Sequence, residues 1–197
     1  MNGFVLAGGR SSRMGTDKAL LHYAGRPLIA HAVDLLKAAG LAPHIVGSRS
    51  DLAVYAPVVE DSHPVCGPLG GIEAALASST SEWNVFLPVD LPLLHLVFVR
   101  YLIERASVTA ATATIPTLAG SPEPLCAVYH RNLLQGIRES IESHNYKVID
   151  GISHAARGSE ADLFSVEAVA ATRDDWPRNS PSHRWFRNLN TPEDLRW

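Results

Sequence analysis

Residues 4–21 read FVLAGGRSSRMGTDKALL, and they join an apolar run to a glycine-rich loop. Phe4–Ala7 is short and continuously apolar, which is typical of a strand buried on both faces. Gly8 and Gly9 end that run, and residues 8–18 combine glycines, hydroxyl side chains and cations. Glycines permit positive φ and close backbone approach. Because ligands of open α/β sheets bind outside the carboxyl ends of strands, this loop is the first place to look for a site.

The charge of this loop favours a polyphosphate ligand. Arg10, Arg13, Lys18 and Arg26 are four of the 17 cationic residues, and Asp17 is the only acid among the first 33 residues. A local positive field on a chain of formal net charge -3 suits a bound anion, whereas turn formation alone has no use for the cations. Two familiar phosphate-binding patterns, the P-loop GxxxxGK[ST] and the dinucleotide fingerprint GxGxxG, are both absent from the sequence.

Apolar patterns along the rest of the chain predict alternating strands and helices. The predicted strands are 4–7, 44–47, 57–60, 83–89, 108–115 and 124–129, and the predicted helices begin at Pro27 and Pro68 and cover about 95–106 and 131–143. This alternation predicts an α/β fold with a mostly parallel sheet. Thr172–Arg187 is instead rich in Asp, Pro, Asn and Ser, which favours turns, and we interpret it as a surface loop, either a substrate lid or a plain linker.

Length and composition limit which classes of protein are possible. A chain of 197 residues is long enough for one sizeable core, and we expect a single domain over residues 1–197. Its 46% hydrophobic and 19% charged residues exclude a disordered or low-complexity chain. The sequence has no sustained basic stripe, which disfavours nucleic acid as a partner. Its N-terminal apolar run is too short for a signal peptide or a membrane span, and Cys66 and Cys126 form no metal motif, so we expect a cytoplasmic protein with no membrane partner.

Residues 6–21 resemble the signature LAGGxSxRMGxDKALL of molybdenum cofactor guanylyltransferases, within the nucleotidyltransferase superfamily. Sugar-phosphate nucleotidyltransferases share the LAGG opening, but they typically carry a longer stretch before their lysine. The resemblance covers residues 3–94, 123–130 and 186–197, and it is weakest over 145–185. It implies a three-layer, Rossmann-like open sheet, mostly parallel, of the nucleotide-diphospho-sugar transferase type.

Asp90 follows the clearest predicted strand, in the element PVDLPLL at 88–94. A hard divalent cation such as Mg²⁺ is usually held by one or two carboxylates together with substrate phosphates. Asp90 fits that role, and capping of the following helix is the alternative interpretation. The resemblance favours the metal, because the family carries its magnesium aspartate in a similar D-x-P-x-[LI] element.

The element NLNTPEDL at 188–195 combines a strand end with a helix start, with Thr191 as a candidate N-cap and Pro192 at the first helical position. A well-capped final helix is the plain interpretation. The family has a similar NxNTPE element beside the metal, which implies that Asn188 and Asn190 face the metal and the phosphates.

The GPLGGI turn at 67–72 is similar to the family's turn near the guanine base, where small residues let a flat base approach the backbone. Close packing of a helix on the sheet is the alternative. As catalytic residues the resemblance implies Arg13, Lys18 and Asp90, and as metal ligands Asp90 and Asn190. For binding of the nucleotide it implies Leu6, Ala7, Gly8, Gly9, Arg10, Ser11, Ser12, Gly15, Lys18, Asp61, Gly67, Gly70, Gly71, Asn188 and Asn190.

The implied activity is transfer of GMP from GTP to the terminal phosphate of molybdenum cofactor (molybdopterin), with release of pyrophosphate and with Mg²⁺ as cofactor. Transient contacts with molybdoenzymes or with proteins of cofactor biosynthesis are also implied. Three alternatives stay open: a molybdopterin cytidylyltransferase, whose relatives often read LAAG; another nucleotidyltransferase with a small acceptor; and a non-catalytic module that senses GTP. Acyl transfer is disfavoured because the sequence has no G-x-S-x-G elbow.

Overall fold

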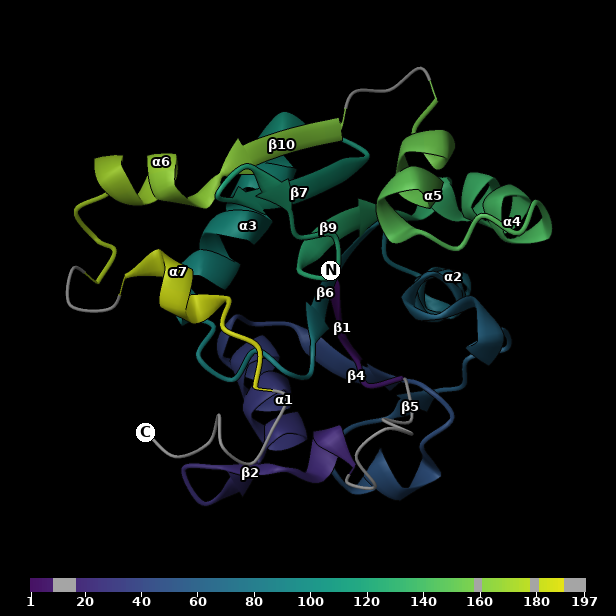
Figure 1. Cartoon of the computed structure of the whole chain (residues 1–197), viewed down its shortest axis with the longest axis horizontal. Helices are drawn as coiled ribbons and strands as arrows, with labels where there is room; N and C mark the ends of the chain where they lie inside the picture. Colours follow the sequence, from purple (N-terminus) through teal and green to yellow (C-terminus); the bar gives the residue numbers. More distant parts are fainter. Residues whose placement is uncertain (9–16, 158–160, 178–180, 190–197) are drawn as a thin grey trace.

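The computed structural model describes residues 1–8, 17–157, 161–177 and 181–189. The strands of its main sheet are β1 Asn2–Leu6, β4 Ala42–Val46, β5 Val58–Val59, β6 Trp83–Pro88, β7 Ala113–Leu118, β8 Ser121–Pro122, β9 Ala127–His130 and β10 Ala161–Ser165. They lie in the order β10-β7-β9-β6-β1-β4-β5, with β8 paired to β7 (Figure 1). A small separate ribbon consists of β2 His22–Tyr23 and β3 Arg26–Pro27.

The predicted mostly parallel sheet is confirmed. β1 is parallel to both of its neighbours, β4 and β6, and the outer pairs β4–β5 and β7–β10 are parallel as well. β9 is antiparallel to β6 and to β7, so the two parallel halves of the sheet point the same way with one reversed strand between them.

Helices cover both faces of the sheet. They are α1 Leu28–Ala38, α2 Pro68–Ser78, α3 Leu96–Thr109, α4 Leu134–Glu142, α5 Val148–Ala155, α6 Val166–Thr172 and α7 Ser182–Trp185, with 3-10 turns η1 Lys18–Leu20, η2 Ser50–Val54, η3 Pro64–Cys66 and η4 Arg131–Leu133. α1, α3, α6 and α7 lie on one side, and α2, α4 and α5 on the other (Figure 1). The result is the three-layer arrangement that the sequence predicts. Within the described part of the chain, no helix is both long enough and apolar enough to cross a membrane.

β1 shows why a continuous apolar run forms a central strand. Successive side chains of a strand point to opposite faces, so a strand with helices on both sides needs apolar residues at every position. Phe4 and Leu6 pack in the core on the α2 side, and Val5 packs in the core on the α1 side.

Two strands begin three or more residues later than predicted. α3 continues through Thr109 and ends at Ala110, whose φ of 51° is left-handed, so the strand predicted over 108–115 begins at Ala113. The strand predicted over 124–129 begins at Ala127, because Cys126 N donates to Glu123 O across a turn. α5, β10 and α6 lie where no element was predicted.

The prediction of a surface loop over 172–187 holds for the exposed described residues of that segment, but it is wrong for α7 and for three aromatic residues. Trp176, Trp185 and Phe186 are buried, and all three rings pack near Phe98 of α3. Each large aromatic ring removes a wide apolar area from water, and this favourable term outweighs the turn preference of the neighbouring polar residues. The segment is therefore anchored to the core through α7 and is neither a plain linker nor a free lid.

Candidate active site at the carboxyl edge of the sheet

The carboxyl ends of three central strands are aligned by their register. Leu6, the last residue of β1, is paired with Val46 at the end of β4 and with Pro88 at the end of β6. Two backbone hydrogen bonds extend this alignment: Ala7 N donates to Val46 O at 3.0 Å, and Val89 N donates to Leu6 O at 3.3 Å. The loops that leave these strands therefore start side by side, at what we call the carboxyl edge.

Lys18 and Asp90 meet at this edge, although 72 positions separate them in the sequence. Lys18 Nζ lies 2.5 Å from Asp90 Oδ2. The two side chains are 28% and 16% exposed, so the pair is partly shielded from water yet accessible from outside. Partial shielding strengthens charge interactions relative to those on an open surface. The edge thus presents an ammonium group and a hard carboxylate oxygen at one point.

The C-terminal segment also reaches Asp90. Leu189 is buried, and its backbone N donates to Asp90 O at 3.0 Å. The neighbouring Asn188 is exposed. Asn190, the second predicted asparagine, lies outside the described residues, as do Thr191 and Pro192 of the predicted helix start.

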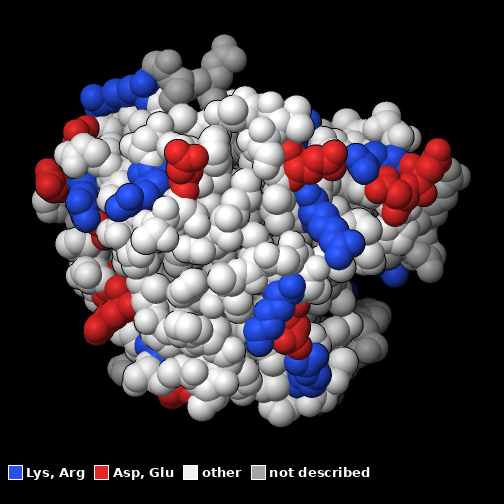
Figure 2. Space-filling model, turned by 180° about the vertical axis from the view of Figure 1, so that it is seen from behind, with Lys and Arg blue, Asp and Glu red and all other residues white. Residues whose placement is uncertain are grey.

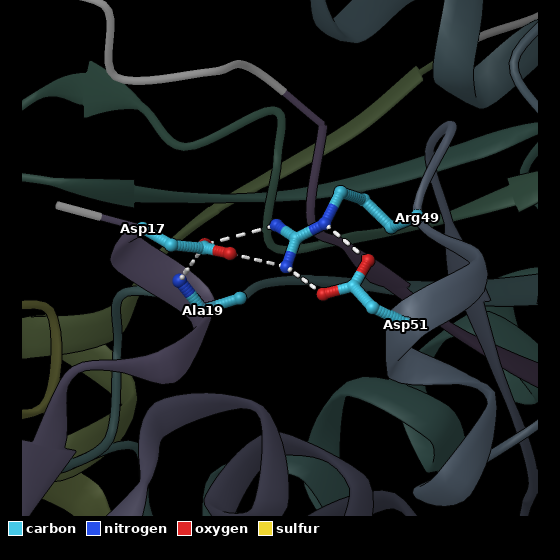
Figure 3. Close-up of polar contacts among 4 residues, drawn as sticks. All are labelled: Asp17, Ala19, Arg49 and Asp51. Atoms are coloured by element: carbon cyan, nitrogen blue, oxygen red, sulfur yellow. Dashed lines mark hydrogen bonds and ion pairs between the residues drawn. The ribbon is translucent and has the colours of Figure 1, made fainter. Parts of the chain in front are cut away.

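Asp17, the residue before Lys18, is held from two sides. Its Oδ1 accepts a hydrogen bond from Ala19 N at 3.0 Å and so caps the turn η1. Arg49, in the loop after β4, donates through Nη1 to Asp17 Oδ1 at 2.9 Å and through Nη2 to Asp17 Oδ2 (Figure 3). The same guanidinium donates to Asp51 through Nε at 2.9 Å and through Nη2 at 2.7 Å. Hydrogen bonding to Asp51 raises the pKa of Arg49, burial opposes that shift and Asp17 adds to it, so the group stays charged.

The turn predicted to lie near a base is built around Asp61. Asp61 is buried, and its Oδ1 accepts a hydrogen bond from His63 N at 2.8 Å. A Cβ on Gly70 would lie 2.5 Å from His63 O and 3.1 Å from Asp61 Oδ1, so only glycine fits there. Gly67 has a φ of 61°, and a Cβ on Gly71 would lie 3.2 Å from Val46 Cγ1, which links the turn to the end of β4.

The remaining predicted residues divide into two groups. Leu6 and Ala7 are buried at the end of β1, and Gly8 is exposed at the start of the loop. The rest lie outside the described residues, and they are Gly9, Arg10, Ser11, Ser12, Arg13 and Gly15.

Sequence reasoning missed three residues of this edge. Gly47 has a φ of 141°, and a Cβ there would lie 3.2 Å from Gly8 N, so this glycine lets the loop after β4 approach the loop after β1. Arg49 lies two positions further along. Glu123 follows β8, and burial, with a further contribution from the charge of Asp90, raises the pKa of its carboxyl. Gly47 is the last residue of a predicted strand, and this signal alone pointed to the missed loop.

The charges on the far face of the molecule are mixed. Figure 2 shows that face, where described Lys and Arg side chains lie beside Asp and Glu in small groups separated by large uncharged areas. Such a surface gives no continuous basic path for a nucleic acid backbone. Among the described residues, no group of three or more His, Cys, Asp or Glu side chains could by itself hold a metal ion.

The fold and the edge geometry define an open-sheet α/β protein with charged side chains at the carboxyl edge, and comparison with known proteins gives its family. The model of the MobA-like NTP transferase domain matches residues 3–157. The chain belongs to this family, and it is therefore a nucleotidyltransferase.

Relatives over nearly the whole chain carry one kind of name. A protein of Thermococcus kodakarensis, named a probable molybdenum cofactor guanylyltransferase, is 32% identical over 100% of this chain and 92% of its own length. The molybdenum cofactor guanylyltransferase of Vibrio atlanticus is 32% identical over 97% of this chain and 91% of its own length.

Solved structures share the fold. The molybdopterin-guanine dinucleotide biosynthesis protein A of Archaeoglobus fulgidus superposes with a TM-score of 0.76 at 23% identity, covering 99% of this chain and 95% of that one. Rv0371c of Mycobacterium tuberculosis, solved in complex with manganese, has a TM-score of 0.59 at 18% identity, covering 84% of this chain and 87% of that one. These likenesses support the predicted nucleotide-diphospho-sugar transferase type of fold.

Proposed function

We propose that this nucleotidyltransferase is a molybdenum cofactor guanylyltransferase, which transfers GMP from GTP to the terminal phosphate of molybdopterin and releases pyrophosphate. The names of its full-length relatives support this activity. The observation that carries the proposal is the pairing of Lys18 with Asp90 at 2.5 Å, at the edge where the glycine-rich loop leaves β1. In this proposal the ammonium group meets the incoming triphosphate, and the carboxylate oxygen meets its metal ion.

The chemistry needs charge neutralisation more than proton transfer. The attacking group is a phosphate monoester, whose second pKa is about 6, so it is largely a dianion at neutral pH and needs no general base. What opposes the reaction is repulsion between two anions. In this proposal Lys18 neutralises the triphosphate, while the backbone amides of Gly8 and of the following loop hold it in line with the acceptor.

The donor set at the edge fits a hard divalent cation. Asp90 offers carboxylate oxygens, and burial, with a further contribution from the charge of Asp90, raises the pKa of the Glu123 carboxyl. One or two carboxylates completed by phosphates and waters are typical of Mg²⁺. When bound, the ion would polarise the phosphate that is attacked. We propose Asp90 as its ligand, with Asn190 as a second and with the exposed Asn188 facing the phosphates.

The base would lie against the turn after Asp61. Gly70 lets α2 lie close to that turn, Gly71 lets α2 pack against Val46, and Gly67 leaves open space on the backbone for a flat ring. We propose that Asp61 and these three glycines hold the guanine, and that Leu6 and Ala7 fix the start of the loop that holds the phosphates.

A product assay tests the proposal. The protein is incubated with Mg²⁺, with each of the four nucleoside triphosphates in turn and with isolated molybdopterin, and the products are identified by mass. We expect a guanine dinucleotide and pyrophosphate, formed from GTP and lost in Asp90→Asn. Preferred use of CTP would make the protein a cytidylyltransferase, and GTP binding without magnesium-dependent pyrophosphate release would make it a binding module.

A further inference from the structure

Arg49 binds two carboxylates of different loops at once. Four hydrogen bonds leave its guanidinium, two to Asp17 and two to Asp51 (Figure 3). The Arg49 side chain is only 17% exposed. A planar guanidinium that binds carboxylates in pairs fixes their orientation as well as their distance. Because most of its N–H groups are occupied, Arg49 has little capacity left to bind a phosphate directly.

The loop that carries Arg49 is rooted in the sheet. Gly47 N donates to Val59 O at 3.0 Å, Arg49 N donates to Gly47 O at 2.8 Å and Leu52 N donates to Arg49 O at 3.0 Å. The same loop touches the start of the glycine-rich loop, where Gly47 packs against Gly8. The guanidinium thus extends from a fixed backbone.

Asp17 transmits this fixed position to Lys18. The Asp17 carboxylate caps Ala19 N, and η1 begins at Lys18, the next residue. A carboxylate held by Arg49 on one side and by the turn on the other sets where the Lys18 side chain starts, and Lys18 Nζ ends on Asp90 Oδ2. Released from Arg49, the Asp17 carboxylate would be an uncompensated negative charge beside Lys18 and would compete for it.

We propose that Arg49 is a positioning residue for the transfer reaction. It holds Asp17, and through Asp17 it sets Lys18 opposite Asp90 before the nucleotide arrives, while it neutralises a carboxylate that would otherwise repel the triphosphate. The inference rests on the proposed function only in assigning Lys18 to the triphosphate. The loop after β4 therefore supports catalysis by positioning Lys18, and it does so without touching the substrate.

The test compares Arg49→Met and Arg49→Lys with Arg105→Met, a matched arginine that binds a carboxylate far from this edge. We expect both Arg49 variants to lower kcat/KM for the triphosphate by about 10–100-fold, since a small misplacement of a positioned group costs up to about 10²-fold. Arg49→Lys should not rescue, because an ammonium cannot bind two carboxylates in pairs. Arg105→Met should lower the Tm and leave kcat/KM unchanged. A folded Arg49→Met with the wild-type kcat/KM would overturn the proposal.

Two further measurements keep the test decisive. In a Lys18→Ala background, Arg49→Met should cost little more, because Arg49 acts through Lys18; full additivity would overturn the proposal. Should Arg49→Met fail to fold, Asp17→Asn breaks the same link while an asparagine still caps η1, and it too should lower kcat/KM. All variants are compared on whichever triphosphate and acceptor the wild type uses, so a wrong substrate assignment leaves this comparison intact.

Discussion

Arg49 and Arg105 have nearly the same local chemistry and serve different regions of the molecule. Arg105 of α3 donates to Asp162 of β10 through Nε at 2.6 Å and through Nη2 at 2.7 Å, to Tyr101 Oη at 2.9 Å, and it stacks 4.7 Å from the Phe164 ring. It joins a helix to the edge strand of the sheet. Arg49 instead joins two loops.

Position relative to the strand ends separates the two arginines. Asp162 is the second residue of β10, so it lies near the amino end of a strand that points the same way as β6 and β7. Arg49 follows the carboxyl end of β4. Ligands of open α/β sheets bind at the carboxyl ends, because the loops there converge. The pair formed by Arg49 at the carboxyl edge therefore indicates a role in function. The pair formed by Arg105 near the amino ends indicates a role in stability.

The largest effect should follow removal of the central pair. We expect Lys18→Ala and Asp90→Asn each to lower the rate of pyrophosphate release by about 10²–10³-fold, because removal of one preorganised charged contact costs about that much. The measurement is steady-state turnover with magnesium, at equal protein concentration and with the Tm of each variant recorded.

Both variants should keep the wild-type fold, since the two side chains lie at the edge of the core. A near-normal turnover in either one would remove that residue from the mechanism. It would also contradict the assignment of function to the carboxyl edge of the sheet and of stability to the amino edge.

Gly70→Ala should damage stability and nucleotide binding together. The new Cβ would lie 2.5 Å from His63 O, a backbone atom that cannot move alone, so we expect a loss of about 1–3 kcal/mol of unfolding free energy and a raised KM for the triphosphate. Denaturant titration and steady-state kinetics measure the two effects.

Gly71→Ala is the matched control for this turn. Its Cβ would lie 3.2 Å from Val46 Cγ1, a side-chain atom that can shift by a few tenths of an ångström, so we expect a smaller loss of stability. Equal losses in the two variants would show that the turn tolerates movement of its backbone. The close contact between a Gly70 Cβ and His63 O would then not explain why this position is glycine.

Arg105→Met tests the structural side of the comparison. The Asp162 carboxylate is 14% exposed and would lose its partner, so we expect a loss of about 1–2 kcal/mol, measured as a Tm about 2–8 °C lower. Turnover per folded molecule should stay at the wild-type value. A fall in turnover without a fall in Tm would assign catalytic importance to the wrong edge.

The parts of the fold that the sequence predicts well are those with continuous apolar runs. β1 and β6 are buried on both faces, so FVLA and WNVFLP allow one interpretation. Ala- and Thr-rich residues near 108–115 have no period, and the boundary between α3 and β7 was misplaced. Trp176 and Trp185 were missed because their Pro, Asp and Asn neighbours favour turns, and only tertiary packing makes two isolated rings part of the core.

The candidate site likewise contains residues that a local sequence pattern predicts and residues that it does not. The signature and the strand-end aspartate predict Lys18 and Asp90, since each has a local pattern. Arg49 has none: a single arginine between two serines after a strand is typical of a solvated turn. Its partner Asp17 lies 32 positions away, a pairing that exists only once β1 and β4 are side by side.

The smallest predicted effect concerns Glu123, at the carboxyl edge but on the antiparallel side. Burial, and then the charge of Asp90, raises the pKa of its carboxyl in the folded protein above the ordinary value. The folded state therefore binds this proton more tightly than the unfolded chain does, and stability is lost as the pH rises through the two values. Glu123→Gln removes that loss, and we expect a Tm about 1–3 °C higher at pH 8 in the presence of a chelator.

The gain should shrink as the pH falls through the raised pKa of Glu123 towards its ordinary value, because the wild-type carboxyl is then protonated as well. Glu167→Gln is the control of opposite sign: burial raises the pKa of Glu167, but hydrogen bonds from Ala119 N and the Ser165 hydroxyl outweigh it and lower the pKa. That variant should lose stability at pH 8. If Glu123→Gln also lowers the Tm, the Glu123 carboxylate makes a favourable contact at the edge that outweighs its burial and the charge of Asp90.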